Sequence, residues 1–152
     1  MPCDMLHAVE VHADPHILFE AVATQGGQRA FWTADATVQP SVGSVAEFGF
    51  PGAPVKLKMR VERLDQDRLV AWHCEGDFPF WKDTRITWEM KAAETPGHTS
   101  FLFTHSGWPE GYPADEFAHV NFTWGGIVAR LKEYVESGKP QPYFPAAAVA
   151  AS

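Results

Sequence analysis

The sequence has few cysteines, few basic residues and no long hydrophobic run. Its two cysteines, Cys3 and Cys74, cannot form the disulfide framework that holds many small secreted domains. Lysine and arginine number 12 against 19 acidic residues, and the net charge of -7 argues against a nucleic-acid partner. No apolar run approaches the roughly 18 residues that span a bilayer, and the first residues lack the features of a secretory signal. We therefore expect a cytoplasmic protein with free thiols and without a membrane partner.

The motifs of common enzyme classes are also missing. His12 and His16 are separated by Pro15 and do not share a helix face, and no pair of cysteines or histidines has zinc-site spacing. There is no G-x-S-x-G sequence, no glycine-rich phosphate loop and no dinucleotide fingerprint. The sequence therefore predicts no metal site and no cofactor, and it identifies no catalytic residue.

What the sequence does contain is a high share of large apolar side chains. Hydrophobic residues make up 45% of the chain and aromatic residues 13%, whereas charged residues make up only 20%. A chain of 152 residues is the size of one ordinary domain. We expect a single domain with an aromatic core over residues 1–143, and a loose alanine-rich tail over residues 144–152.

Alternation of apolar and polar residues predicts an antiparallel sheet in the middle of the chain. The segment VKLKMRVER (55–63) shows this alternation, and RLVAWHCEG (68–76), TRITWEM (84–90) and HTSFLFTH (98–105) repeat it. Shorter strands are expected over residues 5–12 and twice within residues 37–54. The side chains expected to point inward are Leu57, Met59, Trp72, Ile86, Trp88, Phe101 and Phe103.

Two short helices are expected after the first strand, and one long helix is expected near the C-terminus. Between Pro113 and Gly138, apolar residues recur every three or four positions, from Phe117 to Val135. The most economical arrangement is an α+β helix-grip fold, in which a curved antiparallel sheet of six to seven strands wraps around the long C-terminal helix. Because a curved sheet and a straight helix do not match in shape, we expect a cavity between them.

Seven segments, in their order along the chain, carry a resemblance to a known family. They are VEVHADPHILFEAV, FW, VGSVAEFGF, VAWHCEG, FPFWKDTRITWEM, TSFLFTHSGW and WGGIVARLKEYVESGKPQPY. Together they resemble the START-like superfamily, also called SRPBCC or birch-pollen-allergen-like. Within it the chain is most similar, from about residue 6 to 143, to homologues of the C-terminal domain of the heat-shock-protein-90 ATPase activator. The resemblance implies a helix-grip fold but no single function, because the superfamily includes lipid carriers, hormone receptors and polyketide cyclase-like proteins.

The segment FTHSGW (103–108) suggests one polar group in an otherwise apolar cavity. His105 lies two positions after Phe103 and four after Phe101, so all three side chains belong to the same face of the strand. The His105 ring is therefore expected to point toward the long helix as the last inward residue of its strand. Two interpretations stay open: His105 ties the strand end to nearby backbone, or it contacts a ligand as an orienting group or general acid/base. Gly107 would let the chain leave the sheet, and Trp108 would form an aromatic wall beside the long helix.

Other residues near the expected cavity also allow two interpretations. Asn121, on the apolar stripe of the helix, faces either a ligand or a strand backbone. Gly125 and Gly126 indicate a close approach to the sheet or room for a ligand. The segment DFPFWKD (77–83) forms either a pocket lid or a separate hydrophobic cluster. The residues predicted to contact a ligand are Trp32, Met59, Trp72, Phe78, Phe80, Trp81, Trp88, Phe101, Phe103, His105, Trp108, Tyr112, Phe117, Asn121 and Trp124.

Three functions follow from these features. The leading hypothesis is the binding of a small hydrophobic or aromatic molecule between sheet and helix, by a monomer or homodimer. The second is a cyclase- or hydrolase-type enzyme that uses His105 with Tyr112 or Asn121 in the same cavity. The third, implied by the family resemblance, is contact with a chaperone ATPase. The chain matches only the C-terminal domain of such activators, which argues against that third function.

Overall fold

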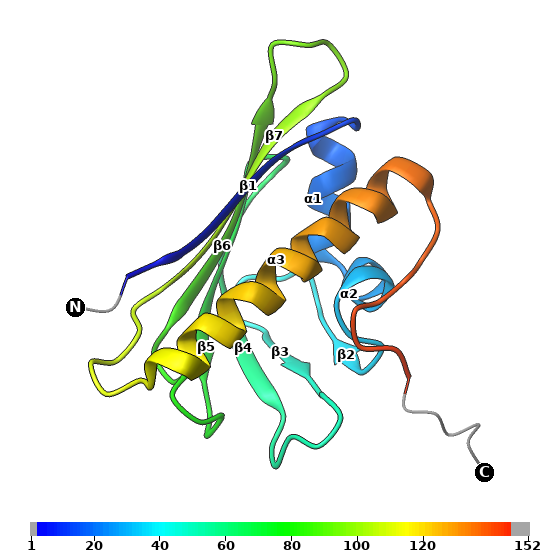
Figure 1. Cartoon of the computed structure of the whole chain (residues 1–152). Helices are drawn as coiled ribbons and strands as arrows, with labels where there is room; N and C mark the ends of the chain where they lie inside the picture. Colours follow the sequence, from blue (N-terminus) through cyan, green and yellow to red (C-terminus); the bar gives the residue numbers. More distant parts are fainter. Residues whose placement is uncertain (1–2, 147–152) are drawn as a thin grey trace.

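The computed structural model describes residues 3–146, which form one antiparallel sheet with helices on one of its faces (Figure 1). Over these residues the sheet has seven strands in the order β1-β7-β6-β5-β4-β3-β2. The elements are β1 Met5–Val11, α1 Pro15–Ala23, α2 Gln25–Phe31, β2 Ala36–Thr37, β3 Val45–Phe48, β4 Leu57–Asp65, β5 Leu69–Glu75, β6 Arg85–Ala92, β7 Thr99–Ser106 and α3 Ala114–Ser137. The predicted helix-grip fold is therefore confirmed.

The alternation in the sequence places one face of each strand in the core. The pairing of β5 with β6 and of β6 with β7 aligns Trp72 with Ile86 and Trp88 with Phe103, so inward residues of neighbouring strands meet. A β-bulge between Val61 and Arg63 shifts the register of β4 against β5. All the side chains predicted to point inward are buried: Leu57, Met59, Trp72, Ile86, Trp88, Phe101 and Phe103.

The helix α3 lies across the inner face of the sheet as one uninterrupted rod. It runs from Ala114 to Ser137 and ends at Gly138, as its apolar stripe predicted. Its buried face consists of Trp124, Ile127, Val128 and Leu131. No helix among the described residues has the length and apolarity needed to cross a membrane.

Aromatic rings fill the centre of the space between α3 and the sheet. The ring centroid of Trp124 lies 4.3 Å from that of Phe103, 5.0 Å from that of Trp32 and 6.0 Å from that of Trp88. Trp32 in turn packs on Phe48 at 4.4 Å. The sequence led us to expect a cavity along this interface. The large side chains instead pack against one another there, and a groove is found at one end of the helix.

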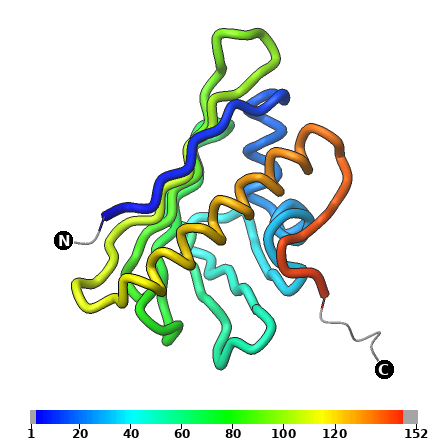
Figure 2. The backbone as a smooth tube through the Cα atoms, in the orientation of Figure 1, coloured from blue at the N-terminus to red at the C-terminus, as the bar shows by residue number. Residues whose placement is uncertain are grey.

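The segment after α3 turns back and runs beside α2 (Figure 2). The Gln141 N–H donates to the Ala30 carbonyl at 2.8 Å, and the Phe144 N–H donates to the Trp32 carbonyl at 2.8 Å. Phe144 also forms a bridge with Thr33. Phe144 was predicted to belong to a loose tail, but these bonds fix it to the domain. Residues 147–152 of that predicted tail lie outside the described residues.

Candidate functional site

A groove of about 350 Å³ opens at one end of the sheet–helix interface. We call it the α3 groove. One wall is formed by α3, and the opposite walls are formed by the β3–β4 connection (49–56) and the β5–β6 connection (76–84). Its lining residues are Trp32, Phe50, Ala53, Pro54, Phe78, Pro79, Trp81, Tyr112, Glu116, His119, Val120, Thr123, Trp124, Ile127 and Phe144. Most of these side chains are apolar, and Glu116 and His119 lie at the exposed rim on α3.

The β5–β6 connection brings the aromatic rings of Phe78 and Trp81 to the groove and that of Phe80 beside it. Phe78 packs edge-on against Phe50 at 5.9 Å and against Trp81 at 5.2 Å, which joins the two connections to each other. Phe80 remains 45% exposed, and its ring lies 5.1 Å from that of Tyr112. The structure therefore places the segment that we interpreted as a lid or a hydrophobic cluster directly along the groove.

The backbone of this connection is strained at Phe80. Its φ angle is 66°, in the left-handed region that bulky side chains rarely adopt. Asp83 has a φ angle of 67° in the same segment. Such conformations cost on the order of 1–3 kcal/mol each and concentrate at binding and catalytic sites. The left-handed conformation of a partly exposed phenylalanine therefore marks this connection as a candidate part of a binding site.

Tyr112 supplies a phenol group at the groove. Its ring stacks on Trp108 with a centroid separation of 4.9 Å and an interplanar angle of 12°. Partial burial raises the pKa of the phenol, so Tyr112 is neutral and can both donate and accept a hydrogen bond. Together with the hydroxyl of Thr123, it gives the otherwise apolar surface a small number of uncharged polar atoms.

His105 lies behind the groove, and its ring has no free polar atom. The indole N–H of Trp124 donates to Nδ1 at 3.1 Å, so this nitrogen is an acceptor and Nε2 carries the proton. The Nε2–H then donates to Oγ1 of Thr84 at 2.9 Å, and the Thr84 hydroxyl donates to the Trp81 carbonyl. Burial lowers the pKa of His105 well below its ordinary value, which keeps the ring neutral. Both partners of the ring are side chains, those of Thr84 and Trp124, and not the nearby backbone that one of our interpretations named.

Asn121 and the helix glycines also contact protein groups. Oδ1 of Asn121 is 3.0 Å from Nε2 of His7 on β1, away from the groove. A Cβ atom built on Gly125 would lie 3.4 Å from the His7 ring, so this glycine does approach the sheet. One built on Gly126 would lie 2.7 Å from the Tyr143 ring, so this glycine makes room for the segment after α3.

The structure brings five of the predicted contact residues to the groove: Trp32, Phe78, Trp81, Tyr112 and Trp124. It does not bring the other ten there. Seven of them lie in the core, namely Met59, Trp72, Trp88, Phe101, Phe103, His105 and Trp108. Phe80 lies beside the groove, Phe117 packs against Trp108 and Tyr112, and Asn121 bonds His7. The alternation along a strand identifies the side chains that point inward. It does not show which of these side chains are buried by neighbouring rings and which line a groove.

Several groove residues were not predicted. Val120 and Ile127 belong to the apolar stripe of α3, which is a signal that could have identified them. Phe50 comes directly before the Pro51-Gly52 turn, an unusual place for a large apolar side chain that is not buried. Phe144 could not be predicted from either signal, because the sequence around it has the composition of a loose C-terminal tail.

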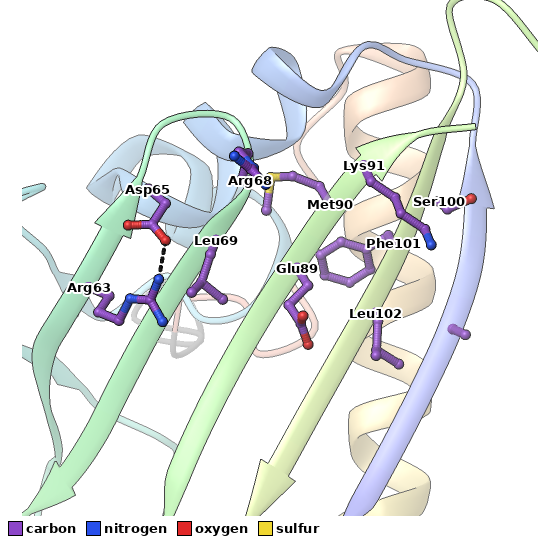
Figure 3. A pocket seen from close by; sticks show the side chains of 11 residues that line it. Arg63, Asp65, Arg68, Leu69, Glu89, Met90, Lys91, Ser100, Phe101 and Leu102 are labelled. Carbon is purple, nitrogen blue, oxygen red and sulfur yellow. Dashed lines mark hydrogen bonds and ion pairs between the residues drawn. The ribbon is translucent and has the colours of Figure 1, made fainter. Parts of the chain in front are cut away.

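A second hollow, of about 690 Å³, lies on the face of the sheet opposite α3 (Figure 3). Its charged side chains have both signs, and Arg63 is ion-paired with Asp65. Leu69, Glu89 and Leu102 lie beside one another on neighbouring strands in this face. Three basic and two acidic side chains line the hollow, so their charges largely balance and do not indicate a particular ligand. We therefore base the function on the α3 groove.

Comparison with known proteins agrees with the fold. The family model described as Activator of Hsp90 ATPase homolog 1-like protein matches residues 12–136. The solution structure of the Aha1 dimer from Colwellia psychrerythraea has 30% sequence identity and a TM-score of 0.79, and the match covers 91% of this chain and 99% of that one. No match is found among curated proteins.

More distant structures share the fold alone. A protein from Staphylococcus saprophyticus has 17% identity and a TM-score of 0.74, with 94% of this chain and 98% of that chain covered. DynU16, a protein of the dynemicin biosynthetic locus, has 20% identity and a TM-score of 0.75. That match covers 95% of this chain but 51% of DynU16.

Proposed function

Because the chain belongs to the family of Activator of Hsp90 ATPase homolog 1-like proteins, we propose that it uses the helix-grip fold to bind a small, largely apolar or aromatic molecule in the α3 groove. The observation that carries the proposal is the composition of this groove. Three tryptophans, Trp32, Trp81 and Trp124, meet there with rings from two loop connections, next to few polar atoms. Loops usually expose polar side chains, so apolar rings in both connections favour an apolar partner.

The volume of the groove and the polar groups at its rim restrict the size and polarity of a ligand that could bind there. A volume of about 350 Å³ lies near the lower end of typical small-molecule sites, which favours a compact ligand with one or two rings. Tyr112 can donate or accept a hydrogen bond with a polar group of the ligand, whereas Thr123, whose hydroxyl donates to the His119 carbonyl, can accept one. Glu116 and His119 are exposed on the rim, where water still solvates them.

Binding of an aromatic probe tests the proposal. In the variant Val120→Arg, a long charged side chain enters the groove from α3, where Val120 is partly buried. The matched control is Phe122→Arg, which adds the same charge to the same helix at a side chain that is 79% exposed. We expect the control to bind the uncharged aromatic probe N-phenyl-1-naphthylamine as the wild type does. We expect Val120→Arg to bind about tenfold more weakly or worse, because losing one large apolar contact costs at least about 1.4 kcal/mol.

The same purified protein is examined by native mass spectrometry for a co-purified ligand. A bound species that is present in wild type and Phe122→Arg but absent from Val120→Arg would support the proposal. Equal probe binding by both variants would overturn it, as would a wild-type protein that binds no member of a library of apolar and aromatic compounds.

The structure offers less support for the enzyme hypothesis. His105, Tyr112 and Asn121 were to act together, but His105 is bonded to Thr84 and Trp124, and Asn121 is bonded to His7. A general acid or base must reach its substrate within hydrogen-bond distance. Because both nitrogens of His105 are occupied by protein groups, the ligand-binding hypothesis is preferred to catalysis.

The comparisons suggest two protein partners that can be tested, a second copy of this chain and a chaperone ATPase. The Colwellia psychrerythraea protein is described as a dimer, which favours the homodimer over the monomer for this chain. Sedimentation velocity over a range of concentrations distinguishes the two. The family description mentions an activator of the Hsp90 ATPase, so a pull-down with such a chaperone checks the third hypothesis.

A further inference from the structure

A cluster of metal-binding side chains lies at the opposite end of the molecule from the α3 groove. Glu10 stands near the end of β1, His12 follows that strand, and His98 comes directly before β7. In Figure 1 the end of β1, the start of β7 and the last turn of α3 lie together, far from the β5–β6 connection and the start of α3. This cluster is therefore independent of the proposed groove.

The pairing of β1 with β7 explains why these residues meet. Glu10 pairs with Ser100 and Val11 pairs with Thr99, so the same register places His12 opposite His98. Glu10 and His12 are two positions apart and lie on the same face of the strand. Their side chains thus share one face of the sheet edge with His98, although the three residues are far apart in sequence. This is why the spacing of histidines in the sequence predicts no metal site.

The side-chain geometry brings three ligand atoms close together. One atom each from Glu10, His12 and His98 all lie within 4.8 Å of one another. Nδ1 of His98 is 2.7 Å from Oε2 of Glu10, and the His12 and His98 rings are stacked with a centroid separation of 4.2 Å. Zinc bonds of about 2.0–2.1 Å in a tetrahedral site require ligand atoms about 3.3 Å apart. Small side-chain rotations therefore suffice to place all three atoms around one cation.

Neighbouring groups hold the cluster without occupying its ligand atoms. The His12 backbone N–H donates to Oε2 of Glu136 at 2.8 Å, which fixes the position of His12 against α3. Lys132 donates to the Glu10 carbonyl and to Glu136, so its positive charge is paired with a carboxylate. The side chains of Glu10 and His98 are 51% and 25% exposed, which gives a dissolved cation access to the cluster.

We propose that Glu10, His12 and His98 form a binding site for a divalent transition-metal cation of the Zn²⁺ class, with two imidazoles and one carboxylate as protein ligands. This donor set suits zinc, copper or nickel, whereas magnesium and calcium prefer oxygen ligands alone. On binding, the cation replaces the proton that His98 shares with Glu10. The bound cation joins the end of β1 to the start of β7, at the edge of the sheet.

Isothermal titration with Zn²⁺ tests the proposal on protein without an affinity tag. The experiment uses a Cys3→Ser background because the exposed Cys3 thiol also binds zinc. Cys74 needs no substitution, since burial raises the pKa of its thiol to about 12 and it stays protonated. The variants are His12→Gln and His98→Gln. The matched control is His16→Gln, which removes an exposed histidine paired with Asp67 and Glu20.

We expect one Zn²⁺ per chain in the Cys3→Ser protein and in the His16→Gln control. Loss of even an outer-shell partner weakens metal sites by about tenfold or more, so loss of either ligand histidine should weaken binding at least as much. Added Mg²⁺ should not compete. Absence of Zn²⁺ binding would overturn the proposal, and so would an unchanged affinity in both ligand variants.

A second measurement requires no substitution in the cluster and thus does not depend on whether the variants fold. The ring signals of the histidines are followed by NMR while Zn²⁺ is added to the Cys3→Ser protein. We expect the signals of His12 and His98 to shift together and to saturate at one equivalent. Shifts that are confined to other histidines would contradict the assignment.

Discussion

His105 shows how a single buried histidine can be held in one protonation state by its neighbours. Trp124 donates to one ring nitrogen and Thr84 accepts from the other, so neither nitrogen is free to take up a proton. Its pKa is lowered well below the ordinary value because burial disfavours the charged ring. In the unfolded chain the same ring is solvated and titrates near about pH 6.5. At mildly acidic pH, the His105 ring therefore holds up to one more proton in the unfolded chain than in the native protein.

Replacing this histidine should change the pH dependence of stability. As the pH falls below about 6.5, His105 should contribute a decrease in the free energy of unfolding with a slope that approaches about 1.4 kcal/mol per pH unit. The variant His105→Gln lacks this contribution, so its slope should be smaller. At neutral pH it should be less stable by about 1–3 kcal/mol, because a glutamine amide cannot reach both buried partners. Urea unfolding at about pH 7.5 and about pH 5.5 measures both effects.

His119→Gln provides the control for this experiment. It makes the same substitution at an exposed position on α3 and should leave the wild-type slope intact. Equal slopes for wild type and His105→Gln would show that His105 takes up a proton in the native state, contrary to the neutral ring described above.

At the scale of the elements, the two glycines of α3 differ in the space that surrounds them. Glycine costs about 1 kcal/mol relative to alanine in a helix interior. The Cβ of alanine at Gly125 would make an ordinary contact with His7, at 3.4 Å, whereas at Gly126 it would press on the Tyr143 ring at 2.7 Å. Only the second position therefore excludes a methyl group.

We expect Gly125→Ala to raise the free energy of unfolding by up to about 1 kcal/mol. Gly126→Ala should give no such gain, because the Tyr143 ring and the segment that carries it must move. Chemical denaturation compares the two variants directly. A stabilisation by Gly126→Ala equal to that of Gly125→Ala would show that the segment after α3 packs loosely on the helix.

The elements themselves were predictable because each has a strong local signal. The alternation in residues 84–90 corresponds to β6, and the three- to four-residue period between Phe117 and Val135 corresponds to α3. The site was less predictable because it depends on contacts between elements. His105 was assigned to its inner face from parity, but its bond to Trp124 depends on how α3 is rotated against β7. The proximity of His12 and His98 depends on the register of β1 against β7. The position of Phe144 depends on a segment that shows no helical or strand periodicity.

At the scale of the whole molecule, Trp124 connects the core to the α3 groove. It packs on Trp32, Trp88 and Phe103, donates to His105 and lines the groove with the same ring. Side chains that serve both the core and a surface groove couple the stability of the fold to the shape of the site. Such a residue is expected to be sensitive to truncation.

The variant Trp124→Ala should lose about 3–5 kcal/mol of stability, as is typical for a fully buried tryptophan. The same change should deepen the groove, so an aromatic probe that replaces the missing ring should recover part of the loss. Thermal unfolding with and without the probe measures both effects. A loss below about 1 kcal/mol would contradict the packing described here, because that cost is typical of surface positions.

The pairing of β1 with β7 also has a consequence for how the chain acquires its structure. Among the described strands, β1 pairs with β7 alone, so this edge of the sheet cannot form until β7 has been synthesised and has left the ribosome. Contacts between such distant parts of a chain slow folding, and sheets of this kind typically form in milliseconds to seconds. Until β7 arrives, the apolar face of β1 has no partner strand beside it and is exposed to aggregation or to chaperones. Expression at reduced temperature, where synthesis and aggregation are both slower, should therefore raise the yield of folded protein more than stabilising substitutions in α3.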